Sequence, residues 1–198
     1  KDARTAGRLT EARVHHTATK LPDGRVLVAG SKGPGTMSMP GPPIGTAEIF
    51  DPAIGDWVET APMSKGREFH VASLLTDGRV LITGGRGPIS YLFSAEIYDP
   101  KSGTWSPGSQ MLGGRMHHQA TTLEDGRVLI TGGKTATYFA TAEMYDPESN
   151  TWSAAGELLG QRAWHRATRL MDGRVLISGG KRAGKQALTE VDIFDPKD

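Results

Sequence analysis

The stretch RMHHQATTLEDGRVLITGG, residues 115–133, decides the fold because close copies of it occur three more times along the chain. The copies cover residues 13–30, 67–85 and 162–180. The histidine that they share recurs after 54, 48 and 47 residues, at His16, His70, His118 and His165. A fixed period of this length indicates an architecture built from one repeated unit. We therefore expect a single domain over residues 1–198.

Each copy predicts a β-hairpin followed by two further strands. Asp-Gly between two runs rich in β-branched residues is a strong hairpin signal. A second block follows, TAEIFDPAIGDW at 46–57 in the first repeat, and its third strand ends at Asp-Pro because proline cannot continue a ladder. A fourth strand begins near Trp57, Trp105 or Trp152. The successive apolar residues Val80, Leu81 and Ile82 predict sheets covered on both faces, as in stacked small sheets.

Three features resemble kelch repeats, whose blades form β-propellers: the paired glycines, the Tyr or Phe before Asp-Pro, and the Trp about 20 residues after the glycines. The variant R-x-x-H-x-A-T-x-L-x-D-G-R-V-L resembles the bacterial, galactose-oxidase-like branch of that family. The resemblance covers essentially the whole chain, although Ser31 replaces one glycine and the fourth repeat lacks its Trp. It implies an all-β propeller of four blades of four antiparallel strands, at about 13–61, 67–109, 115–156, and 162–198 with 1–7.

The two ends of the chain keep the phase of the repeat. His165 lies 33 residues before the C-terminus and His16 is the sixteenth residue, so a head-to-tail join has a period of 49. We expect residues 2–7 to supply the fourth strand of the last blade, which seals a monomeric ring and removes two exposed edges. The alternatives are half of a larger propeller, or a homodimer in which two chains form an eight-bladed ring.

Composition excludes several classes of protein. The 23 Lys and Arg against 22 Asp and Glu give a net charge of +1, without the basic excess of a nucleic-acid-binding domain. No apolar run is long enough to span a bilayer. The absence of cysteine removes disulfides, thiolate nucleophiles and cysteine-ligated metals. No leader sequence is evident. The sequence does not decide between an extracellular or periplasmic location and a cytoplasmic one.

One face of the propeller is expected to carry the variable loops 31–45, 86–93, 134–140 and 181–188. Loops on a rigid scaffold commonly carry binding, and basic loops attract an anionic ligand. The alternative is that these are solubilising surface residues. The candidate binding residues are Lys32, Met37, Met39, Arg86, Tyr91, Lys134, Tyr138, Lys181 and Arg182.

An arginine also recurs once per blade, at Arg13, Arg67, Arg115 and Arg162. An acid also recurs on the third strand, at Glu48, Glu96, Glu143 and Asp192. A semi-buried charge needs a partner, so each arginine is predicted to pair with an acid of its own or the neighbouring blade. The kelch resemblance adds an alternative, because central arginines of such proteins can bind acidic peptides.

The shared histidines allow two interpretations. In a closed ring His16, His70, His118 and His165 could converge on the axis and hold Zn, Cu or Ni. The galactose-oxidase-like resemblance points the same way, since R-x-x-H before an LPDGRV hairpin supplies a copper ligand there; the Tyr–Cys radical of those oxidases is excluded without cysteine. Alternatively each histidine bonds the backbone of an adjacent blade. The preceding residues (His15, Phe69, His117 and Trp164) are interpreted as strand residues that pack the blades.

The sequence favours a non-catalytic binding module over an enzyme. No phosphate loop, nucleophile elbow or catalytic triad is evident. We expect the loop face to bind an anionic or acidic protein, peptide or glycan, with loop 31–45 as the specificity element and no required cofactor. The alternatives are a metal-dependent axial site and a half-propeller whose role is assembly.

Overall fold

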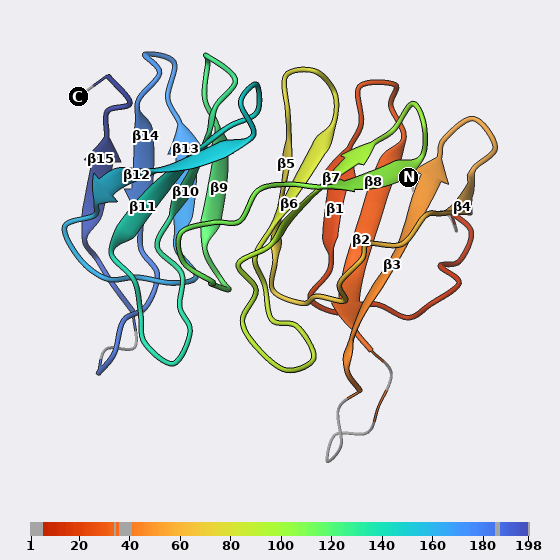
Figure 1. Ribbon diagram of the computed structural model, residues 1–198, viewed down its shortest axis with the longest axis horizontal. Helices are drawn as coiled ribbons and strands as arrows, with labels where there is room; N and C mark the ends of the chain where they lie inside the picture. Colours follow the sequence, from red (N-terminus) through yellow and green to blue (C-terminus); the bar gives the residue numbers. More distant parts are fainter. Residues whose placement is uncertain (1–5, 34, 36–40, 185–186, 198) are drawn as a thin grey trace, which may run out of the picture.

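The computed structural model in Figure 1 consists of β-strands arranged in four sheets. It describes residues 6–33, 35, 41–184 and 187–197, and within these ranges no helix could cross a membrane. The strands are β1 (Thr17–Lys20), β2 (Val26–Lys32), β3 (Pro43–Asp51), β4 (Asp56–Thr60), β5 (Val71–Leu74), β6 (Val80–Thr83), β7 (Ala95–Asp99), β8 (Thr104–Pro107), β9 (Gln119–Thr122), β10 (Val128–Thr131), β11 (Thr141–Asp146), β12 (Thr151–Glu157), β13 (Arg166–Arg169), β14 (Val175–Ser178) and β15 (Val191–Phe194).

The sheets are the blades of a propeller, as the sequence predicts. Blade 1 is β1–β4, blade 2 is β5–β8, blade 3 is β9–β12 and blade 4 is β13–β15, all with antiparallel neighbours in chain order. The first strands pack side by side in the order β1, β5, β9 and β13. The propeller therefore has four strands in three blades and, within the described residues, three in the last.

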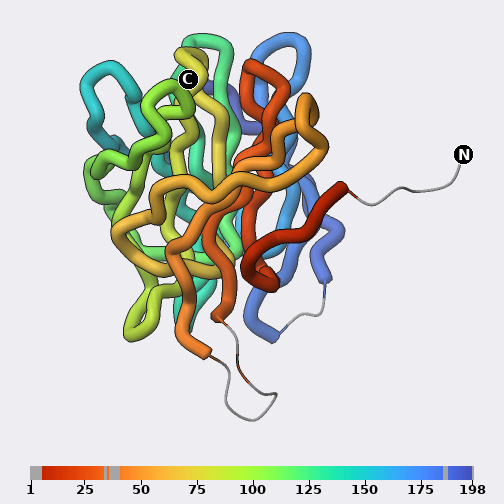
Figure 2. The backbone as a smooth tube through the Cα atoms, turned by 90° about the vertical axis from the view of Figure 1, so that its right-hand side faces the viewer, coloured from red at the N-terminus to blue at the C-terminus, as the bar shows by residue number. Residues whose placement is uncertain are grey.

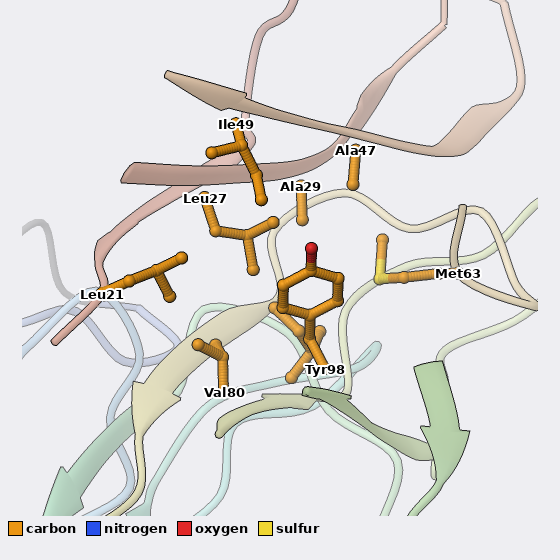
Figure 3. Packing of buried hydrophobic residues seen from close by; sticks show 9 residues of the cluster. Leu21, Leu27, Ala29, Ala47, Ile49, Met63, Val80 and Tyr98 are labelled. Carbon is orange, nitrogen blue, oxygen red and sulfur yellow. The ribbon is translucent and has the colours of Figure 1, made fainter. Parts of the chain in front are cut away.

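The hydrophobic core lies between blades. One face of blade 1, with Leu27 and Ile49, packs against Val80, Ile82 and Tyr98 of blade 2 (Figure 3). Equivalent clusters join blade 2 to blade 3 and blade 3 to blade 4. Complete burial of one such side chain contributes about 1.5–3 kcal/mol to stability. We call the face that packs onto the next blade the forward face and the opposite one the rear face.

The Asp-Gly hairpins form as predicted, and their aspartates have a structural role. In each, the aspartate accepts hydrogen bonds from the backbone N–H and guanidinium of the arginine two residues later, as Asp77 does from Arg79 at 2.9 and 2.7 Å. These turns lie at the upper edge of Figure 1, while the loops between second and third strands lie at the lower edge, and Figure 2 shows the same division from the side. We name the lower edge the loop face and the upper edge the turn face.

Blade 1 departs from the other blades at Ser31, where they have glycine. Gly85 and Gly133 have φ of 94° and 97°, a region that favours glycine, whereas Ser31 lies in extended strand β2. Strand β2 therefore continues to Lys32, and Ser31 and Lys32 pair with Ile44 and Pro43 of β3. The expected loop 31–45 is thus shorter, because both its ends are strand.

The predicted closing strand, residues 2–7, lies mostly outside the described residues, and the described part of blade 4 has three strands. Residues 2–5 lie outside the described chain, but Ala6 lies against blade 1, where its carbonyl accepts a hydrogen bond of 3.0 Å from Trp57 Nε1. Within the described residues β13 does not pack against β1 as the other neighbouring first strands pack. Strand β15 and blade 1 instead lie at opposite ends of the row of blades in Figure 1. Within the described residues the four blades therefore form an open row, without the closure within one chain that the sequence predicts.

Candidate functional site

Each blade places one cation at the same backbone position of the loop face. The backbone N–H of this residue donates to a carbonyl in the connection that precedes the blade, as Arg86 does to Glu68 at 2.8 Å and Lys134 does to Met116 at 2.9 Å. Lys32 bonds Val14 at 3.0 Å, and Lys181 bonds Ala163 at 2.8 Å. Isolated bridges also join Arg86 to Tyr91 and Lys134 to Tyr138. Four of the predicted binding residues (Lys32, Arg86, Lys134 and Lys181) thus form one repeated set.

A row of rings runs across the blades beside these cations. The ring centroids of His15, Phe69, His117 and Trp164 are 4.0, 4.3 and 4.3 Å apart in that order. Each backbone N–H from Phe69 onward donates to the carbonyl of the preceding member, at 3.3, 3.3 and 3.0 Å. All four have φ between 55° and 60°, which is unusual for residues other than glycine. We call these four residues the aromatic row.

The aromatic row corrects one sequence interpretation. Its rings do contact one another from blade to blade, but its residues are left-handed turn residues that precede the first strands, such as β5 at Val71. Sequence alone gives no signal for this conformation, because none of the four is Gly, Asn or Asp. The four equivalent positions show it only when their geometry is compared.

The two ends of the aromatic row differ in charge. At one end Glu68 Oε2 is 3.2 Å from His15 Nδ1, and Glu68 Oε1 is 3.8 Å from Arg86. At the other end Trp164 is 44% exposed, and the ammonium groups of Lys134 and Lys181 are 5.3 and 5.9 Å from the centroid of its ring. Lys134 also lies 5.0 Å from the centroid of Tyr138. This second end joins exposed aromatic surface to two cations.

A shallow hollow of about 240 Å³ opens beside the aromatic row and is lined by all four of its residues. His16, His70, His118 and Arg166 also line it. A larger hollow of about 680 Å³ lies on the turn face, among Pro22, Arg25, Arg79 and Pro100. Its arginines pair with the aspartates of their own hairpins, so that hollow follows from the repeated turn. The loop face is the better candidate site.

The shared histidines link neighbouring blades. His70 Nε2 lies 3.0 Å from the Thr17 hydroxyl, and His118 and His165 lie 2.9 Å from the hydroxyls of Thr83 and Thr131. Blade 1 has Ala29 at the position of Thr83, which explains why Thr17 supplies the hydroxyl there. These three histidines do link to an adjacent blade, but the predicted partner was wrong: it is a side-chain hydroxyl and not the backbone.

Burial keeps these histidines neutral. It lowers the pKa of His70 to about 3 and that of His165 to about 4, assisted by Arg67 and Arg162. Burial, assisted by Arg115, also holds the pKa of His118 well below its usual value. His16 is exposed. Within the described chain no three His, Cys, Asp or Glu side chains are grouped as metal ligands, so no shared set of histidine ligands is formed in this conformation.

The recurrent arginines pair with acids of their own blades, which confirms that prediction. Arg13 and Arg67 lie 2.7 Å from Glu48 and Glu96, Arg162 lies 3.1 Å from Asp192, and Arg115 pairs with Glu143. The four arginine side chains are at most 2% exposed. Burial raises the pKa of Glu48, but the Thr10 N–H and Arg13 outweigh it and hold that pKa below its usual value. These pairs clamp the connections onto the blades and leave none of these four arginines free on the surface.

The structure describes only some of the remaining predicted binding residues. Met37 and Met39 lie outside the described residues. Arg182 is 3.0 Å from Glu190 in the loop of blade 4. Glu68 was missed, although a signal was present: it is an acid at the position that Val14, Met116 and Ala163 occupy in the other repeats.

The fold and the repeated site define the class of the protein as a β-propeller that exposes a loop face. The sequence model of the Kelch motif matches residues 69–112 and 124–159, which fall in blades 2 and 3. Together with the four-bladed arrangement, this match supports a kelch-repeat β-propeller. No curated protein matches the chain.

Proposed function

We propose that this kelch-repeat propeller is a non-catalytic scaffold that binds an acidic partner on its loop face. The observation that carries the proposal is the cation repeated once per blade beside the aromatic row. Kelch propellers generally bind proteins, so an acidic peptide segment of a protein is the favoured ligand. The stacked blades supply the rigid frame, and the loop face supplies charge and aromatic surface.

The end of the row at Trp164 is the expected anchor point. Tryptophan is enriched among residues that dominate binding energy, and it is 44% exposed here. Lys134 and Lys181 lie close enough to the indole to contact carboxylates of a ligand that covers it. The other end is less suited to an anion because Glu68 already pairs with Arg86 and His15.

A charge-reversal experiment tests the site. The probe is a fluorescein-labelled peptide of six glutamates and one tyrosine, with a hexalysine analogue as the negative ligand. We expect the acidic peptide to bind with a salt-sensitive affinity that falls more than about tenfold in the variant Lys134→Glu/Lys181→Glu. The readout is fluorescence anisotropy at several salt concentrations.

The matched control reverses two charges on the opposite face. The variant Lys101→Glu/Lys197→Glu changes the net charge equally but alters residues of the turns after the third strands. It should retain most of the affinity if binding is local. Equal losses in both variants would mean that the peptide responds to net charge, and the loop-face site would be wrong.

The loop between β2 and β3 is the proposed specificity element. Its strand ends are fixed by the pairs Ser31 with Ile44 and Lys32 with Pro43, and Gly33 N–H donates to Pro42 at 2.9 Å. Replacement of residues 34–41 by Gly-Gly should therefore leave the ladder and the melting temperature nearly unchanged while changing the ranking of acidic peptides in a binding array. An unchanged ranking would remove this loop from the site.

A further inference from the structure

The forward face of blade 4 has the composition of an interface but is not covered. In blade 2, Leu81, Ala95 and Ile97 are 0%, 2% and 4% exposed because blade 3 packs on them. Leu176, Val191 and Ile193 hold the same places in blade 4. Val191 and Ile193 are both 52% exposed. A β-branched pair this exposed is unusual on a sheet face that is apolar in every other blade.

The rear face of blade 1 is the complement that this surface lacks. In blades 2 and 3, the rear residues Val80, Tyr98, Val128 and Tyr145 are fully buried against the preceding blade. Their counterparts in blade 1, Val26 and Phe50, are only partly buried. Within the described residues the chain therefore carries one forward face and one rear face that no other blade covers, and the same pairing of faces occurs three times among its blades.

The hydrogen bond that links neighbouring blades elsewhere, from a histidine to a hydroxyl, is also missing at these two faces in the described part of the chain. His16 is exposed, whereas the equivalent His118 is buried and bonds Thr83 of the preceding blade. Ser178 occupies the position of Thr83 in blade 4 and carries the hydroxyl that His16 lacks. The repeat thus predicts a Ser178–His16 hydrogen bond across a fourth interface.

Ala6 shows where a preceding blade belongs. Its carbonyl accepts a hydrogen bond from Trp57 Nε1 at 3.0 Å. The corresponding Trp105 and Trp152 donate to Ala61 and Ser109, which follow the outer strands of the preceding blades, at 2.7 and 3.0 Å. Blade 1 is therefore arranged as if the outer strand of another blade ended beside it. Blade 4 is the blade whose fourth, outer strand is absent from the described residues.

We infer that a second copy of the chain fills both places, with blade 4 of each copy packed on blade 1 of the other. Two chains then form a closed ring of eight blades, which is within the range of known propellers, whereas three would exceed it. Closure within one chain requires β13 to reach β1, and the described blades do not bring them together. This assembly is independent of the proposed loop-face binding.

Molar mass measured by light scattering over a dilution series tests the inference. The protein should approach twice its mass of 21.2 kDa at high concentration. The variant Ile193→Glu should raise the dimer dissociation constant more than about tenfold, because an unpaired carboxylate would be buried in the interface. Because Ile193 is 52% exposed in the single chain, the variant should still fold, and circular dichroism verifies this.

Two further variants make the test specific. Ile89→Glu places the same charge on a residue that is 99% exposed in a loop of blade 2, and it should leave the dimer intact. His16→Ala should weaken the dimer without changing the far-ultraviolet spectrum. A chain that stays monomeric at all concentrations, or dimers equally weakened by Ile89→Glu and Ile193→Glu, would overturn the inference.

Discussion

Three buried histidines make the stability of this propeller sensitive to mild acid. His70 and His165 have folded-state pKa values of about 3 and about 4, well below the usual histidine pKa of about 6.5. Below pH 6.5 the unfolded chain therefore binds protons that the folded chain excludes. The stability that these neutral histidines contribute is fully present above about pH 6.5 and is lost as the pH falls toward their folded pKa values.

The first prediction at residue scale follows from this loss of stability as the pH falls. Between about pH 7 and about pH 5, the free energy of unfolding should fall by up to about 1.4 kcal/mol per pH unit for each such histidine. Urea unfolding at several pH values measures it. The variant His165→Gln should be less stable at neutral pH but lose less stability on acidification; an unchanged slope would show that other groups dominate.

The buried ion pairs give a second residue-scale prediction. Arg115→Met leaves the carboxylate of Glu143 buried without its cation and should cost about 3–5 kcal/mol. Arg127→Met removes a partner of Asp125 from a hairpin pair in which both side chains are at least 40% exposed, and it should cost less than about 1 kcal/mol. Similar losses for both variants, measured by urea unfolding, would contradict the structural role assigned to Arg115.

At the scale of elements, the sequence predicted the strands well. It did not predict the backbone conformation of the residues that precede the first strand of each blade. The Asp-Gly hairpins and Asp-Pro endings are decided by local backbone chemistry, so all four repeats form them. The left-handed conformation of Phe69 and its equivalents is held by contacts from the neighbouring blade, including the bond from Phe69 N–H to the His15 carbonyl. Because that information is not local, a residue pattern read along the chain assigned these positions to strands.

The glycines that end the second strands provide an element-scale prediction. A methyl group on Gly133 would lie 2.9 Å from His118 Cβ and 3.0 Å from the Met116 carbonyl, in addition to the strain of φ 97°. Gly156 has φ 84° but open space around its Cα. Gly133→Ala should therefore cost at least about 2 kcal/mol more than Gly156→Ala, which should cost about 1 kcal/mol. Thermal melts compare the two, and equal losses would mean that the blades separate to admit the methyl group.

At the scale of the whole molecule, sequence arithmetic could not decide how the ends are arranged. A period of 49 across the join is satisfied equally by one chain that closes on itself and by two chains that close on each other. The choice depends on how blades are placed relative to one another, which no single repeat encodes. The recurrent pairing of Arg67 with Glu96 was predictable because both lie within one blade, whereas the cation position shared by Lys32 and Lys181 emerged only from the bridges to the preceding connections.

The uneven covering of the blades should be visible in hydrogen exchange. In dilute protein, amides of β15, at an uncovered face, should exchange at least about tenfold faster than those of β11, which is paired on both sides. Mass spectrometry of peptic peptides resolves the two segments. Equal protection of β15 and β11 in dilute protein would show that blade 4 is already covered within one chain.

The aromatic row has a consequence for how ligand choice can change. One backbone position accepts imidazole, phenyl and indole in successive repeats without altering the sheets that follow it. Substitutions there can accumulate one ring at a time while the hydrophobic clusters stay intact. Each repeat thus offers an independently adjustable recognition element, and libraries diversified at only these four positions would sample new specificities on an unchanged framework.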